Sequence, residues 1–357
     1  MITNKLNVLS GFLGMLFLAS CTGNPGNSSD FFHPGISDYL IPVNTSGAHI
    51  GKISGSGLTH PLHFEIIKDS SGKFETDSTG IIRLKPGASI DTLGNTYIYG
   101  ITIGMNGYKK EIELVRNDFL TNKAVAHRGA WKNTGKSQNS IGSLQRAIDA
   151  GCAWSELDVW MSADGHPILS HDAEIDGLKV EESTLKDLKK IQLKDGEHLP
   201  SLEECIDLVK NQNKTRLFVE IKPSDLSPER AQELAVKVVE LVHAKKAQAW
   251  VKYISFDINV LLRILEKDHF ASVAYLGNDK SVEELHDLNM WGIDFNRSMF
   301  ENNGKLVNEA HELGMTVNAW TVNDPELMDY LLMLGVDFIT TDEPEILLSK
   351  TALPAQR

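Results

Sequence analysis

From Lys123 onward, short apolar runs alternate with segments in which apolar residues recur every three or four positions. The short runs predict strands and the periodic segments predict helices. Helical patterns occupy, among others, residues 137–150, 201–210, 228–244 and 326–334. Eight runs are predicted as strands: residues 124–126, 155–159, 217–221, 252–256, 272–276, 293–296, 316–321 and 337–341.

Eight strands that alternate with helices predict an α/β fold, a (β/α)₈ barrel of the TIM type over residues 122–348. Residues 167–170 are predicted as the returning arm of a hairpin and are not counted among the eight. A doubly wound open sheet is the alternative, but no glycine-rich nucleotide loop follows any predicted strand.

Residues 38–116 have a different pattern, in which β-branched and aromatic runs are separated by Ser-Gly, Pro-Gly and Asn-Gly turns. The runs at 62–67, 80–84 and 97–103 predict strands in a small all-β sandwich. The order of Phe74, Asp77 and Tyr97 is similar to a cadherin-type or immunoglobulin-like repeat. The acidic residues lack the spacing of a calcium loop, so no metal is expected there. A role as spacer or scaffold is preferred to ligand binding.

The first 20 residues predict an export signal, with Lys5 before an apolar run from residue 8 to 19 that is too short to span a membrane. The sequence Leu18-Ala19-Ser20-Cys21 resembles the bacterial lipoprotein box. In that interpretation the peptide is cleaved before Cys21 and the sulfur of Cys21 carries a lipid, whereas a plain secretory peptide is the alternative. Residues 21–37 then predict a flexible tether. The expected location is the bacterial cell envelope, facing the periplasm or the cell surface, with the membrane as a partner through Cys21.

Charge and cysteine content restrict the other partners. The formal net charge of −13 argues against a nucleic-acid surface, which is normally basic. Cys152 and Cys205 lie in helix-like apolar patterns and are expected to be buried free thiols. A disulfide between them is the alternative in an oxidising compartment.

Candidate chemistry is concentrated between residues 123 and 172. An apolar run ends in His127-Arg128-Gly129, and Glu156 and Asp158 follow in the next predicted strand. Alternate residues of a strand share a face, so these two carboxylates converge. They repel each other unless a cation lies between them. The stretch therefore predicts a site.

A hairpin in the same stretch is expected to bring a histidine to these carboxylates. Asp164-Gly165 predicts a type I′ turn, in which Ala163 faces His166. The ladder then places Asp158 opposite His171, with Cβ atoms roughly 5 Å apart. An ordinary hairpin with incidental polar residues is the alternative.

Six motifs follow one another in a fixed order across residues 122–348: His127-Arg128-Gly129, Gln138-Asn139-Ser140, Glu156-x-Asp158, His171-Asp172, Glu220-x-Lys222 and Trp320-Thr321-Val322-Asn323. This ordered set resembles the glycerophosphodiester phosphodiesterases. The family usually has Glu-Asn-Thr where this chain has Gln138-Asn139-Ser140, which puts a charged role at that glutamate position in doubt.

Three carboxylates, from Glu156, Asp158 and Glu220, favour a hard cation such as Ca²⁺ or Mg²⁺ over Zn²⁺, and the resemblance assigns them as metal ligands. The alternative is that one of the three, most readily Glu220, only forms a salt bridge with Lys222 or Arg128. The resemblance implies hydrolysis of a small-molecule glycerophosphodiester to an alcohol and sn-glycerol 3-phosphate.

Roles for the remaining residues follow from the charge of a phosphodiester. Arg128 and Lys222 would bind the phosphoryl oxygens and offset their charge. In the family's usual route a glycerol hydroxyl attacks phosphorus and water opens the resulting cyclic phosphate. His127 and His171 are the expected acid and base, with the order left open. The side chain of Trp320 is expected to form an apolar wall beside the glycerol carbons. The alternative is that it belongs to the core of the barrel.

Asp172 and Asn139 are expected to orient their neighbours by hydrogen bonding. Asn139 is assigned to the loop that carries His127.

Two competing functions remain. One keeps the site but acts on an intact lipid, as the related phospholipase C and D barrels do. The other is a non-catalytic binding protein, in which the barrel is degenerate and the all-β module of residues 38–116 performs the function. The only support for it in the sequence is Gln138.

Overall fold

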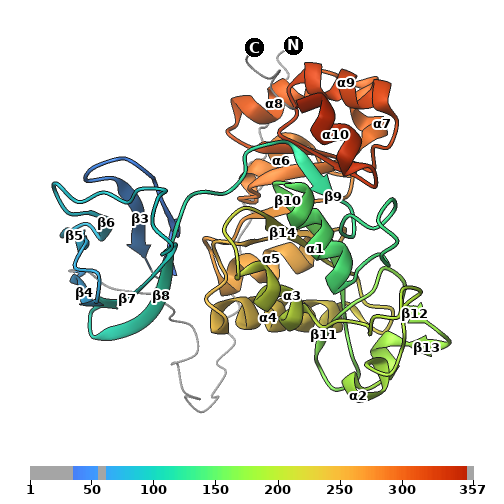
Figure 1. Ribbon diagram of the computed structural model, residues 1–357, viewed down its shortest axis with the longest axis horizontal. Coiled ribbons are helices and arrows are strands. Elements are labelled where there is room, and N and C mark those ends of the chain that lie inside the picture. Colours follow the sequence, from blue (N-terminus) through green and yellow to red (C-terminus); the bar gives the residue numbers. More distant parts are fainter. Residues whose placement is uncertain (1–34, 55–61, 352–357) are drawn as a thin grey trace, which may run out of the picture.

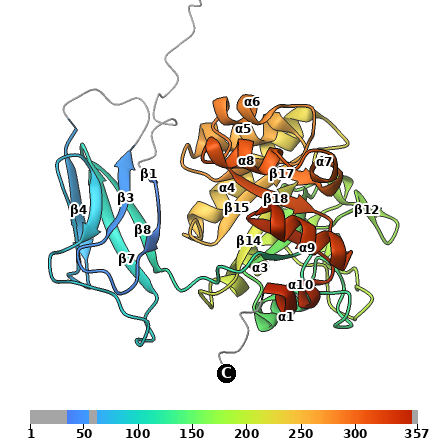
Figure 2. The same cartoon turned by 90° about the horizontal axis from the view of Figure 1, so that it is seen from above.

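The computed structural model describes residues 35–54 and 62–351. The predicted export signal, Cys21 and most of the predicted tether lie outside these residues. Two bodies lie side by side in both views, a small all-β module and a larger barrel (Figures 1 and 2).

The module consists of two four-stranded sheets. A shared apolar core, which includes Ile50, Ile82, Leu84, Ile103 and Leu114, fills the space between them. The predicted sandwich is thereby confirmed. One sheet has the order β1 (Gly35–Ile36), β3 (His49–Ser54), β6 (Ile81–Leu84) and β5 (Phe74–Thr76). The other has the order β2 (Leu40–Ile41), β8 (Tyr108–Arg116), β7 (Ile98–Met105) and β4 (Phe64–Asp69).

Eight parallel strands close into the barrel, because the last of them pairs with the first at Ile339↔Ala124. Each overlaps a run predicted as a strand, so the predicted fold is confirmed. The strands are β9 (Ala124–Ala126), β10 (Trp154–Met161), β14 (Arg216–Ile221), β15 (Val251–Ser255), β16 (Val273–Tyr275), β17 (Gly292–Asn296), β18 (Thr316–Trp320) and β19 (Phe338–Thr341).

Helices cover the outside of the barrel, and their first turns are fixed by serine, threonine, asparagine or aspartate caps at most positions. One predicted start was wrong in a way that concerns the site. The helix expected from residue 137 begins at Ile141, because the Ser140 side chain accepts a hydrogen bond from the Ser143 amide. Residues 137–139 therefore remain in a loop. The helices are α1 (Ile141–Ala150), α2 (Leu185–Leu188), α3 (Leu202–Val209), α4 (Pro228–Ala244), α5 (Ile258–Lys267), α6 (Val282–Asp287), α7 (Arg297–Asn302), α8 (Leu306–Glu312), α9 (Pro325–Leu334) and α10 (Pro344–Thr351).

The interior of the barrel is aromatic near the amino ends of the strands. Trp154 stacks on Phe218 with ring centroids 4.4 Å apart, and Phe338 meets both rings edge-on. Trp291 closes the cluster against Phe338. These rings fill the half of the barrel interior that lies toward the amino ends of the strands. Polar side chains further along the same strands therefore gather at the carboxyl end.

The predicted hairpin exists, but its predicted register was wrong by one residue. Strand β11 (Pro167–Leu169) pairs with β10 through Val159↔Leu169, so Asp158 bonds Ser170 rather than facing His171. The turn is a three-residue loop, in which the Gly165 amide bonds the Ser162 carbonyl and only Gly165 has positive φ. The carboxylate of Asp164 accepts hydrogen bonds from Ser162 and from the Leu185 amide, which favours this turn over type I′.

Residues 173–200 form an insertion between this hairpin and α3. It contains the hairpin β12 (Glu174–Ile175) and β13 (Leu178–Lys179), the 3₁₀ turn Val180–Glu182 and α2. It lies at the lower right of Figure 1. Its apolar side chains, among them Ile191 and Leu199, pack on Trp160. The insertion thereby covers one side of the barrel next to His171.

Cys152 and Cys205 are buried free thiols, as predicted. Burial raises the pKa of Cys152 to about 12, and it also raises the pKa of Cys205. Neither thiol is therefore a ready nucleophile. Within residues 35–54 and 62–351, no helix combines the length and apolarity that a membrane span requires.

Candidate active site

The predicted site residues come from strand ends far apart in the sequence and meet at the carboxyl end of the barrel. A cavity of about 130 Å³ lies among them. Asp158 lies beside it and is bonded to two of the residues that line it. The lining residues are His127, Arg128, Glu156, His171, Glu220, Lys222, Ile254, Phe256, Leu276, Asp294, Trp320, Thr321 and Thr340.

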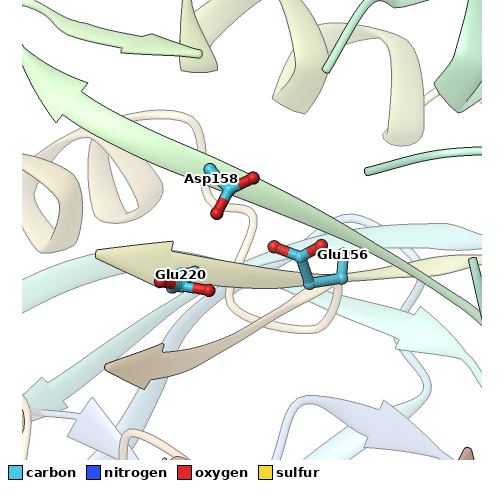
Figure 3. Close-up of side chains that lie close together, drawn as sticks. All are labelled: Glu156, Asp158 and Glu220. Atoms are coloured by element: carbon cyan, nitrogen blue, oxygen red, sulfur yellow. The ribbon is translucent and has the colours of Figure 1, made fainter. Parts of the chain in front are cut away.

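Glu156, Asp158 and Glu220 form a buried carboxylate triad, in which one oxygen from each lies within 4.8 Å of the others (Figure 3). Glu156 and Asp158 lie on β10, and Asp158 is in register with Glu220 on β14. The convergence predicted from their alternate positions is therefore observed. Their exposed fractions are only 3%, 1% and 8%.

The charges of the triad are unevenly balanced. Burial raises the pKa of Glu156 well above its usual value, and the charges of Asp158 and Glu220 raise it further. Burial, followed by the charge of Asp158, raises the pKa of Glu220 to about 7. Burial also acts on Asp158, but the nearby Lys222 and Arg128 outweigh it and hold the pKa of Asp158 below its usual value.

The triad fits a divalent cation. Oε1 of Glu156 is buried and has no hydrogen-bond partner among the described residues. An orphaned carboxylate oxygen is costly unless something else satisfies it. All the donor atoms are carboxylate oxygens, which suit a hard cation. Glu220 also lies 2.7 Å from Lys222 Nζ, so the salt bridge weighed as an alternative exists beside the cluster.

Two side-chain cations border the triad. Lys222 Nζ lies 3.1 Å from Oδ1 of Asp158, and Arg128 Nε lies 3.4 Å from Oδ2. Arg128 has a left-handed backbone with φ of 58°, and its amide donates a hydrogen bond to Glu156 Oε2 at 2.9 Å. The charges of Asp158 and Glu220 outweigh burial and raise the pKa of Lys222, so the ammonium stays protonated.

Gln138 accounts for the one departure from the family pattern. Its side-chain oxygen accepts a hydrogen bond from Arg128 Nη1 at 2.9 Å. A glutamate would accept the same bond and add a negative charge. The glutamine orients Arg128 but adds no negative charge beside it. The positive charge of the guanidinium is therefore less offset and can attract an anionic ligand more strongly.

Asn139 holds Asp158 by two reciprocal hydrogen bonds. Its Nδ2 donates to Asp158 Oδ2 at 2.8 Å, and its Oδ1 accepts from the Asp158 amide at 3.0 Å. Its own amide bonds the carbonyl of Arg128, in the loop where its orienting role was expected. Asn139 adopts φ of 53°, a conformation that asparagine tolerates better than most residues.

Each of the two histidines at the site, His127 and His171, has a carboxylate partner on Nδ1. His127 Nδ1 lies 2.7 Å from Asp342 Oδ1, and Asn323 donates to the other oxygen of Asp342 at 2.7 Å. His171 Nδ1 lies 2.7 Å from Asp172 Oδ1, which agrees with the orienting role expected for Asp172. Asp342 was not among the predicted site residues, although its position directly after the eighth strand was a usable signal.

Trp320 belongs both to the cavity wall and to the barrel packing. Its Nε1 donates to the Asp294 carbonyl at 2.9 Å, and its ring meets Phe256 edge-on at 5.4 Å. Together with Ile254 and Leu276 these rings make one side of the cavity apolar. The two roles considered for Trp320 are therefore compatible.

A second, larger cavity of about 670 Å³ meets the first at His171. It lies between the loop of residues 131–139 and the insertion of residues 173–200, and its apolar lining includes Ile175, Leu193 and Leu199. No pattern of residues predicted this cavity, because it depends on how the insertion folds back over the barrel.

Comparisons with known proteins agree with this site. The sequence model of the glycerophosphoryl diester phosphodiesterase family matches residues 127–346. A glycerophosphodiester phosphodiesterase of Caldanaerobacter subterraneus is 27% identical over 238 residues, which cover 63% of this chain and 96% of that protein.

Solved structures give the same result. A glycerophosphodiester phosphodiesterase from Parabacteroides distasonis is 38% identical, with a TM-score of 0.62, and the match covers 66% of this chain and 100% of that one. An Oleispira antarctica phosphodiesterase, solved with the product sn-glycerol-3-phosphate, has a TM-score of 0.58 and 24% identity; the match covers 64% of this chain and 96% of that one. The resemblance inferred from the motifs is confirmed. The chain belongs to the glycerophosphoryl diester phosphodiesterase family and is a phosphoric diester hydrolase.

Proposed function

We propose that this enzyme hydrolyses glycerophosphodiesters to an alcohol and sn-glycerol 3-phosphate, with His127 and His171 as the acid–base pair. One observation carries the proposal: two carboxylate-paired histidines, two cations and a carboxylate triad surround one cavity at the carboxyl end of the barrel. The product bound to the Oleispira enzyme supports the same product here.

The phosphate is the anionic part of the substrate and would lie on the charged side of the cavity. Arg128 and Lys222 would contact the phosphoryl oxygens, and the low dielectric of a buried site strengthens that attraction. Glu156, Asp158 and Glu220 would hold Ca²⁺ or Mg²⁺. The positive charge of the ion would further offset the negative charge of the phosphoryl oxygens. The all-oxygen ligand set favours these two ions over softer metals.

The chemical steps require one base and one acid. The hydroxyl of the glycerol carbon next to the ester attacks phosphorus, and one histidine takes its proton. The bond from phosphorus to the alcohol oxygen breaks, and the other histidine protonates that oxygen. Water then opens the cyclic phosphate with the two roles reversed. Asp342 and Asp172 fix Nδ1 of each ring, which leaves Nε2 as the nitrogen that exchanges the proton.

The test is release of sn-glycerol 3-phosphate by the protein of residues 22–357, in the presence of Ca²⁺ or Mg²⁺. Glycerophosphocholine, glycerophosphoethanolamine and glycerophosphoglycerol are suitable substrates. His127→Ala and His171→Ala should each lower kcat by at least about 10²-fold. His286→Ala is the matched control, since this histidine lies on α6 with its side chain 48% exposed. Full activity in both active-site variants would refute the histidine assignment.

The large cavity beside His171, which is lined by apolar and by charged side chains, favours a second candidate, action on an intact lipid. Its 670 Å³ exceeds what a small alcohol needs, and its wall includes Ile175 and Leu193. Hydrolysis of liposomal phospholipid or lysophospholipid, without hydrolysis of water-soluble glycerophosphodiesters, would establish this candidate in place of the first. The degenerate-barrel alternative loses its support, because Gln138 still binds Arg128.

We also propose attachment to a bacterial envelope membrane through a lipid on Cys21, supported by the lipoprotein-box pattern of residues 18–21. The β module would then act as a spacer between membrane and barrel. Full-length protein expressed in a bacterium should partition into detergent, and Cys21→Ala should move it to the aqueous phase. Equal partitioning of the two proteins would refute the anchor.

A further inference from the structure

Three polar side chains lie in a row at the smaller cavity, the one of about 130 Å³ that His127 and the carboxylates border; this row is called the cavity floor. Asp294, Asn318 and Thr340 lie on the neighbouring strands β17, β18 and β19. Asn318 Nδ2 donates to Asp294 Oδ1 at 2.9 Å and to Thr340 Oγ1 at 2.8 Å. Oδ1 of Asn318 is buried and has no hydrogen-bond partner among the described residues. All three side chains are less than 5% exposed, yet Asp294 and Thr340 border the cavity.

Asp294 is separate from the metal triad. In the part of the chain that the structure describes, only Glu156, Asp158 and Glu220 bring ligand oxygens within 4.8 Å of one another. One oxygen of Asp294 is bonded to Asn318, and its other oxygen receives no hydrogen bond from a described residue. A buried carboxyl is costly without partners. A ligand hydroxyl in the cavity would supply the missing one.

The two sides of the cavity differ in chemistry. Arg128, Lys222 and the triad lie on or just after β9, β10 and β14 and would hold the phosphate. The opposite side, from β15 to β18, presents Ile254, Phe256, Leu276 and Trp320. Carbon atoms of the substrate fit that apolar side. Among the lining residues of that side, Asp294 is the carboxyl that can bond a hydroxyl.

We infer that Asp294, held by Asn318, binds the terminal hydroxyl of the glycerol moiety and so selects glycerol phosphates over alkyl phosphates. The inference rests on the proposed function, because it takes the phosphate side of the cavity from that proposal. The middle hydroxyl must reach phosphorus, which leaves the terminal hydroxyl for the cavity floor.

The protonation of Asp294 suits this role in either state. Burial raises the pKa of its carboxyl to about 7, with the charge of Glu220 adding to the effect and the Asn318 hydrogen bond opposing it. A hydroxyl can donate to a carboxylate and accept from a carboxylic acid. The contact therefore forms on both sides of neutral pH.

Binding of four phosphate monoesters to the Ca²⁺-loaded enzyme tests the inference by calorimetry. The ligands are sn-glycerol 3-phosphate, 3-hydroxypropyl phosphate, 2-hydroxypropyl phosphate and n-propyl phosphate. The first two carry the terminal hydroxyl and should bind at least about 10-fold more tightly than the last two, because a site built for a hydroxyl is left unpaired without it. Asp294→Ala should reduce this ratio below about 3-fold while the affinity for n-propyl phosphate is kept.

Asp294→Asn can still bond a hydroxyl and should keep part of the discrimination, whereas a purely structural role would not distinguish the ligands. If Asp294→Ala does not fold, Asp294→Ser replaces it, since serine keeps a polar group but is too short to reach the ligand. Equal affinities of the wild type for all four ligands would overturn the inference. Equal weakening of all four ligands in the variant would also overturn it. Failure of the proposed function would give a different result: the wild type would still discriminate among the four ligands but would not hydrolyse a glycerophosphodiester.

Discussion

Nδ1 of His127 lies 2.7 Å from Oδ1 of Asp342, although the two residues are 215 positions apart in the sequence. They meet because β9 and β19 are neighbours in the closed barrel, with Thr341 in register with Ala126. Burial alone would raise the pKa of Asp342, but its hydrogen bonds to His127 and Asn323 outweigh this and lower it. Asp342 therefore stays ionised and fixes the tautomer of His127.

Replacing Asp342 should impair catalysis without unfolding the protein. Asp342→Asn keeps the shape but can donate to Nδ1, which favours the wrong tautomer, so kcat should fall by roughly 10²–10⁴-fold. Asp337→Asn is the matched control, because Asp337 also pairs with a histidine, His311, at 2.9 Å and away from the cavity. Steady-state kinetics with glycerophosphocholine measure both. A loss below about 3-fold in Asp342→Asn would contradict this role.

The stability of the metal-free protein should depend on Glu220. Its folded-state pKa of about 7 lies above its ordinary value of 4.5, so the folded protein keeps a proton that the unfolded chain releases. The stabilisation is therefore present below about pH 4.5 and is lost as the pH rises through 7.

Urea unfolding of wild type and Glu220→Gln in chelator checks this dependence. From pH 5 to pH 8 the wild type should lose on the order of 3 kcal/mol more of its free energy of unfolding than the variant does. Saturating Ca²⁺ should reduce the difference between the two pH values. Parallel pH curves for wild type and variant would show that Glu220 titrates normally.

Asn139 should control metal affinity through Asp158. Asn139→Gly keeps the left-handed backbone but removes both side-chain hydrogen bonds to Asp158. The affinity for Ca²⁺ should fall by about 10–100-fold, the usual effect of removing a group that orients a ligand. Calorimetry of the metal-free protein measures it. Unchanged affinity would mean that Asp158 is positioned by Lys222 and Arg128 alone.

Gln138 should act through its hydrogen bond to Arg128 rather than through charge. Gln138→Leu removes the acceptor at 2.9 Å and should lower kcat/KM by about 5–10-fold. Gln138→Glu keeps the acceptor and should stay within about 3-fold of wild type in kcat, with a higher KM because it offsets the charge of Arg128. An inactive Gln138→Glu enzyme beside a fully active Gln138→Leu enzyme would reverse this assignment.

The barrel could be predicted because its strands are short, buried apolar runs between amphipathic helices. The triad could be predicted because alternate residues of β10 share a face. The hairpin register could not, since it depends on contacts of the Asp164 side chain with Ser162 and with Leu185 in the insertion. Asp294 and Asp342 are single aspartates in or after a strand, and only the closed barrel shows which of them face the site.

The most direct test of a metal-dependent phosphodiesterase is release of sn-glycerol 3-phosphate before and after removal of divalent cations. Wild-type protein should lose at least about 10²-fold of its rate in chelator and regain it with Ca²⁺ or Mg²⁺. Glu156→Gln should remain inactive after the cation is restored. Unchanged release in chelator, or full activity of Glu156→Gln, would contradict the account of the carboxylate triad as the metal site.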